Sequence, residues 1–362
     1  MTLIETYIEY IASVRRYSKR TQEIYYNVLQ SFSDFVYIHR TSGEEISANN
    51  INDIINTDTV RGYEIYLIEK KKFNPKSVCL HISVLSGFCR YLMLKKIISY
   101  NPARNITRPK TDKKLPVFYR HASMAKYLSE SEIFVSYTDG MSPVDFIGAY
   151  LRFKDKPGYS TEKDSVLAMM NEMSDKPERF AEWIYTKKLD RLIVSILYST
   201  GMRRGELISL TRGSVDFHRQ QIKVKGKGDK TREIPVIKSL CKEISLYLQT
   251  VDATSCIIHG TDSPLLMTYR GKALYPVYVD RAVKRELGET GLFTARKSPH
   301  VLRHTLATEL LNNGADINSI KELLGHSSLA ATQIYTHNSV AKLKKVYTNA
   351  HPRAKSGGKH GD

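Results

Sequence analysis

The sequence predicts a mainly helical protein with a small β-hairpin, an α+β arrangement divided into two domains. Apolar residues recur at helical spacing through the first hundred positions and again over much of the second half of the chain. Two segments of alternating polarity, residues 221–225 and 232–237, flank a turn that contains Gly226 and Gly228, and they predict the hairpin. A chain of 362 residues is long enough for a separate core in each domain.

The first domain, residues 1–103, is expected to be a small basic bundle of four helices. Apolar stripes place these helices at about residues 3–14, 18–35, 60–69 and 75–92. Ser18 and Asn56 are suitable residues to begin the second and third helices, and Pro75 suits the first turn of the fourth.

The segment 101–116 is polar, basic and interrupted by prolines, without helical periodicity. We expect residues 104–116 to be an interdomain linker, residues 117–353 a second domain, and residues 354–362 a flexible tail rich in Gly and Lys. Within the second domain we expect helices at 239–248, 275–287 and 300–311, a further helix ending at 324, and a last one at 339–348. A short buried strand is expected at 264–267.

The charge balance favours an extended polyanion as partner. Lys and Arg number 55 against 37 Asp and Glu, a net charge of +18, which is more than solubility alone requires. No run approaches the roughly 20 apolar residues of a membrane span, and no signal peptide is recognised. The four cysteines, Cys79, Cys89, Cys241 and Cys256, form no metal motif and are interpreted as reduced packing residues of a cytoplasmic protein.

The stretch from residue 300 to 335 carries the strongest chemical signal. His300 and His304 lie four residues apart on a predicted helix, a spacing shared by ordinary surface or core histidines and by zinc ligands. The metalloprotease pattern requires Glu directly after the first His, where this chain has Val301, and no nearby Cys or carboxylate completes a ligand set. A third interpretation is a phosphate-binding active site with Tyr335 as nucleophile.

Upstream residues support the third interpretation. The words TGMRRGEL (200–207) and GKGDK (226–230) precede HVLRH (300–304), LLGHSS (323–328) and Tyr335, in that order. This ordered set resembles the tyrosine recombinases of the phage-integrase superfamily, and most closely their Xer-type site-specific recombinases. The interval of nine residues between His326 and Tyr335 (335 − 326 = 9) also agrees with that family.

The resemblance implies six catalytic residues and one acidic neighbour. The catalytic set is Arg203, Lys227, His300, Arg303, His326 and the nucleophile Tyr335, with Glu206 supporting it. Independent chemistry agrees, since two permanently charged guanidiniums can neutralise both non-bridging oxygens of a phosphodiester without metal. The expected reaction cuts and rejoins duplex DNA through a 3′-phosphotyrosyl intermediate, with no cofactor and no metal ion.

The resemblance also implies a partner and an assembly. Residues 1–103 would be a SAM-like core-binding domain that forms one half of a C-shaped clamp around double-stranded DNA, with no arm-binding domain before it. The expected assembly is a homo-tetramer on two duplexes with inverted half-sites, from a monomer or dimer off DNA, alone or with a second related recombinase. We expect it to be cytoplasmic and nucleoid-associated. The candidate DNA contacts are Arg15, Arg16, Lys19, Arg20, Lys76, Arg90, Arg281, Lys284 and Arg285.

The chain departs from the family pattern between about residues 131 and 188, where an insertion separates the linker from the TGMRRGEL word. It is either a surface elaboration or a module that contacts another subunit or a partner. Its methionines, Met169, Met170 and Met173, are expected to serve packing rather than recognition.

Two other function classes remain possible from the sequence. A type IB topoisomerase uses similar tyrosine chemistry but typically has lysine where His300 stands. A non-catalytic DNA-binding protein would have no need of all six residues together. The sequence therefore favours a recombinase, and it leaves open whether the biological outcome is resolution, inversion or integration of DNA.

Overall fold

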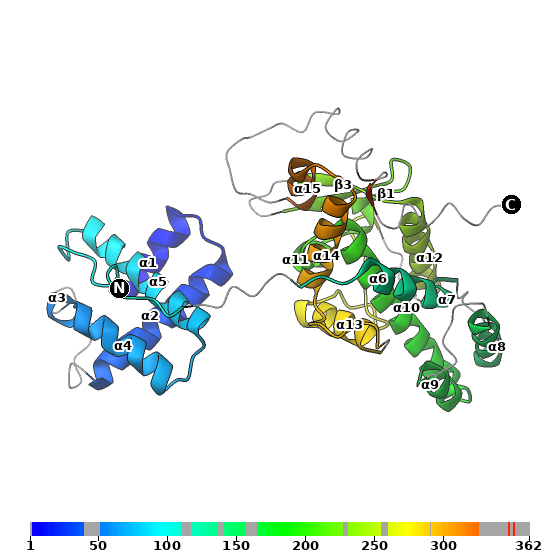
Figure 1. Ribbon diagram of the computed structural model, residues 1–362, viewed down its shortest axis with the longest axis horizontal. Helices are drawn as coiled ribbons and strands as arrows, with labels where there is room; N and C mark the ends of the chain where they lie inside the picture. Colours follow the sequence, from blue (N-terminus) through cyan, green and yellow to red (C-terminus); the bar gives the residue numbers. More distant parts are fainter. Residues whose placement is uncertain are drawn as a thin grey trace. The chain divides into compact units, whose positions relative to one another are not determined.

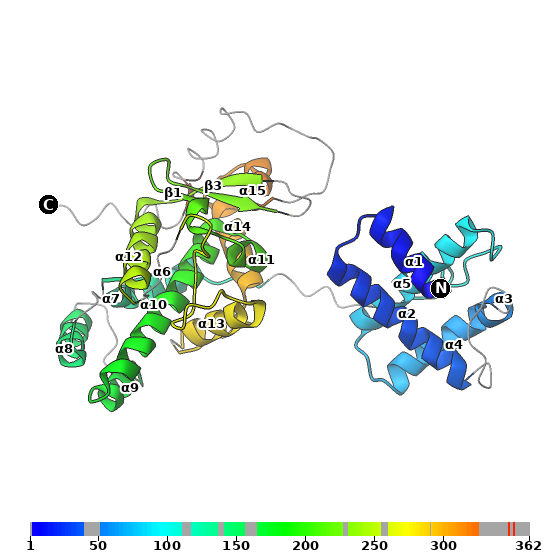
Figure 2. The same cartoon turned by 180° about the vertical axis from the view of Figure 1, so that it is seen from behind.

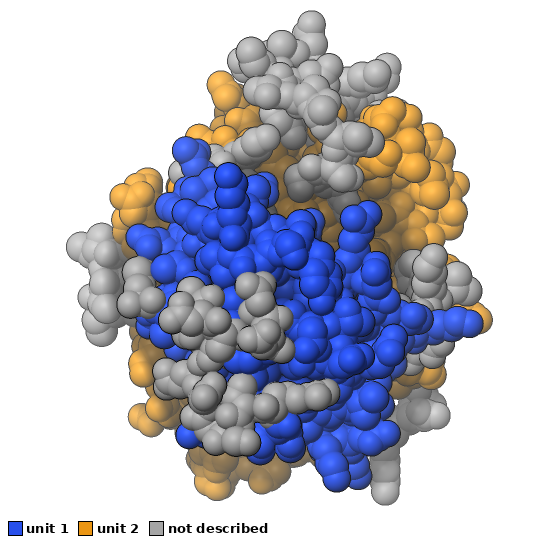
Figure 3. Space-filling model, turned by 90° about the vertical axis from the view of Figure 1, so that its left-hand side faces the viewer, with its two compact units in different colours: residues 1–114 blue, residues 115–362 orange. Residues whose placement is uncertain are grey.

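The computed structural model describes residues 2–39, 51–110, 117–136, 141–155, 165–226, 231–254, 260–289, 291–325, 347, 350 and 351. The chain divides into two compact units, Met1–Lys114 and Leu115–Asp362, which are coloured separately in Figure 3. The division falls inside the basic, proline-containing segment 101–116.

All regular secondary structure in the described residues of the first unit is helical. Its helices are α1 (Leu3–Ser13), α2 (Lys19–His39), α3 (Ile51–Ile54), α4 (Thr57–Glu69) and α5 (Pro75–Leu94). The four helices predicted from the sequence are confirmed, and Asn56 caps α4 by accepting a hydrogen bond from the Thr59 amide at 2.9 Å. The short helix α3 was not predicted.

Helix α5 is the centre of this unit, and it corrects one expectation from the sequence. It is 20 residues long with a mean hydropathy of 1.4, so by length and composition it could span a membrane, contrary to our expectation that no such run exists. Half of it is buried within the unit, where Ile82, Leu85 and Phe88 pack against α2 and α4. A buried core helix of this kind passes the same test without entering a membrane.

The second unit is organised around α10 (Pro177–Thr200), whose residues from Lys187 onward are all buried. Helices α12 (Lys238–Thr254), α13 (Pro276–Glu289) and α14 (Pro299–Asn312) pack against it (Figure 1). The remaining elements are α6 (His121–Glu130), α7 (Ile133–Ser136), α8 (Pro143–Lys154), α9 (Ser165–Met173), α11 (Arg204–Ile208), η1 (Arg212–Ser214) and α15 (Ile317–Leu324).

A three-stranded antiparallel sheet completes the second unit. Its strands are β1 (Val215–Asp216), β2 (Gln221–Lys225) and β3 (Thr231–Pro235), in that order. The β2–β3 hairpin is confirmed, whereas β1 was not predicted. The expected strand at 264–267 is wrong: Pro264 and Met267 form only isolated bridges, although Leu265 and Leu266 are buried as expected.

The inserted region has a hydrophobic cluster of its own. Phe134, Phe146, Met170 and Phe180 are buried together where α7, α8 and α9 meet the start of α10. In both views α8 and α9 lie at the end of α10 opposite the sheet (Figures 1 and 2). Because α10 runs unbroken through residue 188, the fold has no boundary at the end that we assigned to the insertion.

The packing interpretation of the methionines is confirmed for two of the three. Met170 and Met173 are buried in the cluster, while Met169 is 43% exposed.

Two glycines with positive φ allow a direct test of close packing at the end of α10. At Gly201 (φ 61°) an added Cβ would lie 2.5 Å from Leu324 Cδ2, whereas at Gly314 (φ 81°) it would meet nothing within 4 Å. Both alanine variants bear the backbone cost of about 1–2 kcal/mol, but only Gly201→Ala adds an overlap costing about 1–3 kcal/mol.

We therefore expect Gly201→Ala to lower the free energy of unfolding more than Gly314→Ala. Urea unfolding followed through the fluorescence of Trp183, the single tryptophan of the chain, reports on the second unit. Equal losses in the two variants would contradict the close contact of Gly201 with Leu324.

Candidate active site

The first catalytic arginine predicted from the sequence, Arg203, lies at the junction of two helices. Helix α10 ends at Gly201 in the left-handed conformation, and Arg203 then caps the start of α11. Its backbone amide donates to Glu206 at 2.7 Å and its Nη1 donates to the same carboxylate at 2.9 Å. The Arg203 side chain stays 41% exposed, so a ligand can reach it.

The second arginine, Arg303, lies near the start of α14 and extends toward Gly201 and the end of α15. It is buried, and its Nη1 donates to the carbonyl of Gly201 at 2.6 Å. Its Nη2 donates to the carbonyl of Leu324 at 2.7 Å. The guanidinium therefore connects the end of α10 with the end of α15.

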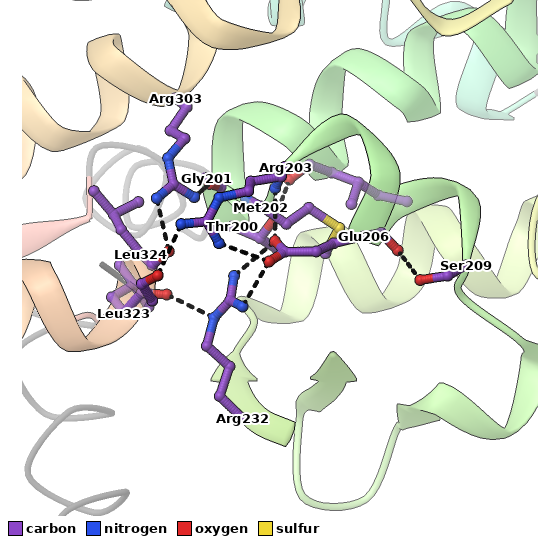
Figure 4. A network of polar contacts seen from close by, with 12 residues as sticks. Thr200, Gly201, Met202, Arg203, Glu206, Ser209, Arg232, Arg303, Leu323 and Leu324 are labelled. Carbon is purple, nitrogen blue, oxygen red and sulfur yellow. Dashed lines mark hydrogen bonds and ion pairs between the residues drawn. The ribbon is translucent and has the colours of Figure 1, made fainter. Parts of the chain in front are cut away.

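The end of α15 is the meeting point of the site (Figure 4). The carbonyl of Gly325 accepts from Arg203 Nη2 at 2.8 Å, and the carbonyl of Leu323 accepts from Arg232 Nε at 3.2 Å. The last carbonyls of a helix lack partners within the helix and carry its negative dipole, so they are natural acceptors for guanidinium groups. Three arginines from three separate elements are thus fixed on one helix end.

Arg232 is the residue of this site that sequence reasoning missed. It is buried on β3, and its two terminal nitrogens donate to the two carboxylate oxygens of Glu206, both at 2.9 Å. A signal existed in the sequence: Arg232 shares the strand face of Ile234 and pairs with Val224, which are both buried. An arginine on the apolar face of a strand requires a buried partner.

Burial and charge set the protonation of these groups. Burial alone would raise the pKa of Glu206, but the hydrogen bonds from Arg232 and from the Arg203 amide outweigh it and hold that pKa below its usual value. Burial and the neighbouring Arg203 lower the pKa of Arg303 to about 10, so it remains charged at neutral pH. Glu206 is the anion and the arginines are the cations of the resting site.

His300 stands at the start of α14, one turn before Arg303, and is exposed. Partial desolvation lowers its pKa, and the positive charge of Arg204 lowers it further. The neutral imidazole, which can accept a proton, is therefore the main form at pH 7. His304 is also exposed, and no group of three His, Cys, Asp or Glu suited to a metal ion occurs in the described parts of the chain.

Three predicted catalytic residues, Lys227, His326 and Tyr335, lie outside the described residues. Gly325 immediately precedes His326, and Gly226 on the hairpin immediately precedes Lys227. The structure therefore brings together Arg203, Glu206 and Arg303, with His300 on the same helix as Arg303.

The nine candidate DNA contacts are all exposed. On α13, Arg281, Lys284 and Arg285 line a shallow hollow. Arg285 also donates to the fully buried Asp190 of α10, through Nε at 2.7 Å and through Nη2. Burial raises the pKa of Asp190 to about 7, although the charge of Arg285 opposes that shift. The hydrogen bonds of this pair join α13 to α10.

Comparisons with known proteins identify the family of the chain. A model described as the phage integrase family matches residues 160–342. The tyrosine recombinase XerC of Bacillus licheniformis is 30% identical over 354 residues, which cover 97% of this chain and 96% of that protein. The chain belongs to the phage integrase family.

Other members support the assignment over nearly the whole chain. The tyrosine recombinase XerC of Chlorobaculum parvum is 28% identical over 360 residues, covering 97% of this chain and 94% of that protein. Within the phage integrase family, the chain is a tyrosine-type site-specific recombinase. The resemblance noted in the sequence is confirmed.

Solved structures show that the fold is shared. The XerH site-specific recombinase bound to difH substrate has a TM-score of 0.57 at 18% identity, with 97% of this chain and 83% of that chain covered. The Tn1549 transposon integrase in complex with a circular intermediate DNA also has a TM-score of 0.57, at 16% identity, covering 95% and 99% of the chains. The prediction of a mainly helical fold with a small sheet is confirmed.

We expect a pH titration followed by NMR to give His300 an imidazole pKa below its ordinary value. Arg204→Gln should raise this pKa, because it removes a nearby positive charge that disfavours the imidazolium. His300→Asn assigns the signal, and Arg212→Gln serves as the control, because the electrostatic causes of the shift do not include Arg212. An unshifted pKa in the native chain, or no response to Arg204→Gln, would contradict the description of this site.

Proposed function

We propose that this chain cuts and rejoins duplex DNA at specific sites by metal-free transesterification, with Tyr335 as the nucleophile. The observation that carries this proposal is the convergence of Arg203 and Arg303 on the end of α15, where they donate to the carbonyls of Gly325 and Leu324. The two guanidiniums are fixed by backbone carbonyls and by Glu206 before any substrate arrives. Each has five N–H donors, more than these contacts use, so both can also bind a phosphate.

In this proposal the scissile phosphate lies against Arg203 and Arg303. Their charges offset the charge of the phosphodiester, which otherwise repels a nucleophile, and they stabilise the further charge that develops on its oxygens. Preorganised donors achieve this without reorienting during the reaction. His326, the residue after Gly325, adds a further hydrogen bond to the phosphate.

The proposed proton transfers involve His300 and Lys227. A tyrosine phenol has a pKa of about 10 and must lose its proton, and neutral His300 is the proposed base. The Tyr335 oxygen bonds to phosphorus while the bond from phosphorus to the 5′ oxygen breaks, and Lys227 gives that oxygen its proton. The 3′-phosphotyrosyl ester conserves the bond energy, so the 5′-hydroxyl of another strand can reverse the step and join the strands.

We propose the corresponding DNA-binding arrangement for the whole chain. Residues 1–103 act as the core-binding domain and residues 117–353 as the catalytic domain, and the two hold the duplex as a C-shaped clamp. The exposed basic residues named above supply the phosphate contacts. Four copies act on two duplexes with inverted half-sites, in the cytoplasm at the nucleoid, with one gene product or two related ones.

The nucleophile is tested with a nicked substrate from which the freed 5′-hydroxyl diffuses away, so that a covalent adduct accumulates. We expect a 3′-linked adduct that forms in the presence of EDTA, and we expect Tyr335→Phe to abolish it because the variant lacks the attacking oxygen. The measurement is a denaturing gel of radiolabelled DNA. The control is Tyr347→Phe, which changes the tyrosine twelve residues further along the sequence (347 − 335 = 12).

The outcomes separate the candidate functions. An adduct that survives Tyr335→Phe would mean that another tyrosine is the nucleophile. Tight, specific binding without any adduct in the native chain would instead favour a non-catalytic DNA-binding protein.

The role of Lys227 is tested by changing the leaving group. Lys227→Ala should slow cleavage of normal DNA by about 10²–10⁴-fold, the usual contribution of a general acid. A substrate with sulfur in place of the bridging 5′ oxygen should restore most of the rate, because a thiol of pKa about 8.5 leaves without a proton. Arg203→Ala, which lacks a phosphate-binding group, should stay slow on both substrates. No recovery of Lys227→Ala with sulfur would assign the proton to another group.

A further inference from the structure

We propose that Arg232 is a positioning residue of this active site, which holds Glu206 and supplies its counter-charge so that Arg203 remains directed to the substrate. This inference rests on the proposed function and deepens it, because it explains how the phosphate-binding arginine keeps its charge available. It assigns a role to a residue for which the ordered catalytic set has no place.

Geometry makes Arg232 the principal side-chain partner of Glu206. Glu206 is buried and accepts from two arginines and one backbone amide. Arg232 takes both carboxylate oxygens in a two-bond fork at 2.9 Å each, whereas Arg203 contributes a single side-chain bond. The fork is the stronger and more directional contact. Arg232 therefore fixes the plane of the carboxylate on which Arg203 rests.

Burial makes the charge of Arg232 important to its neighbours. The Arg232 side chain is 7% exposed and that of Glu206 6%, whereas Arg203 is 41% exposed. If Arg232 is removed, Glu206 is left as a buried anion whose nearest remaining cation is Arg203. A buried charge without a partner is costly, so the carboxylate would draw the Arg203 guanidinium into the vacant place and away from solvent. The phosphate site would then lose both geometry and charge.

Arg232 also contacts the fold around the site. Arg232 belongs to β3, and its Nε donates to Leu323 on α15. A Cβ added at Gly325 would lie only 3.1 Å from the Arg232 guanidinium, so this helix end fits closely over the arginine. The Arg232 side chain thus connects strand β3 of the hairpin with Glu206 on α11 and with the end of α15. Lys227 lies in the sequence between β2 and β3, and His326 directly follows Gly325 at the end of α15.

The test uses the nicked-substrate assay with Arg232→Met, which leaves Glu206 charged with Arg203 as its one remaining arginine partner among the described contacts. We expect cleavage to slow about 100-fold, the effect of misplacing a group that stabilises the transition state. Adding Glu206→Gln to Arg232→Met should recover at least about tenfold, because the uncompensated carboxylate that captures Arg203 is gone. A merely structural role predicts that the double variant is as slow as Arg232→Met or slower.

Two further variants complete the design. Arg232→Lys, which keeps the charge without the two-bond fork, should lie between Arg232→Met and the native chain, and it replaces Arg232→Met if that variant fails to fold by Trp183 fluorescence. Arg212→Met is the matched control, since it breaks another arginine–carboxylate pair, with Asp252 at 2.6 Å, outside the active-site network. Its cleavage rate should stay within about twofold of the native rate.

The possible failures are distinguishable. A native rate in both Arg232→Met and Arg232→Lys, or no recovery when Glu206→Gln is added, would overturn the positioning role while the native adduct, absent in Tyr335→Phe, sustains the proposed function. Absence of an adduct in the native chain would overturn both.

Discussion

The active site depends on one constraint. Three arginines, Arg203, Arg232 and Arg303, lie close together in a partly buried site, and each guanidinium must have hydrogen-bond acceptors there. Glu206 satisfies part of that requirement, and the last carbonyls of α15 satisfy the rest. Two glycines make the arrangement possible. Gly201 and Gly325 both have positive φ, at 61° and 64°. A Cβ at Gly201 would overlap Leu324 at 2.5 Å, so its absence lets the ends of α10 and α15 approach closely, whereas a Cβ at Gly325 would lie tightly against the Arg232 guanidinium at 3.1 Å.

The long helix α10 supports the active site, because its buried half packs against several other elements and ends at Gly201. Its buried half carries charged residues that are paired with other elements: Lys187 with Glu286 at 3.2 Å, Arg191 with Glu243, and Asp190 with Arg285. Such pairs add little net stability but fix which neighbours pack where. Helix α13, which presents basic residues to solvent, is therefore registered against the same helix that ends at Gly201, so the surface proposed to bind DNA and the phosphate site share one support.

Sequence reasoning reached the parts of this site that local rules govern. A glycine that ends an apolar helix, a hairpin with a glycine-containing turn, and His300 and Arg303 on one helical turn follow from spacing and backbone preference. Arg232 was missed because its role depends on Glu206, 26 residues earlier, and on Leu323, 91 residues later. The prediction of a strand at 264–267 was wrong because a short apolar run indicates burial without requiring a strand. Leu265, Leu266 and Met267 are buried there.

The charges of the described site suit the transition state better than the ground state. Three guanidiniums and one carboxylate, Arg203, Arg232, Arg303 and Glu206, give a net charge of 3 − 1 = +2. A phosphodiester carries a single negative charge at rest and more at its oxygens during attack. A site with Glu206 but without Arg232 would balance the resting substrate and lack the surplus. Catalysis depends on interactions that are stronger in the transition state. In the proposed reaction Arg232 would act indirectly, by offsetting Glu206 so that the charges of Arg203 and Arg303 stay available for the developing charge.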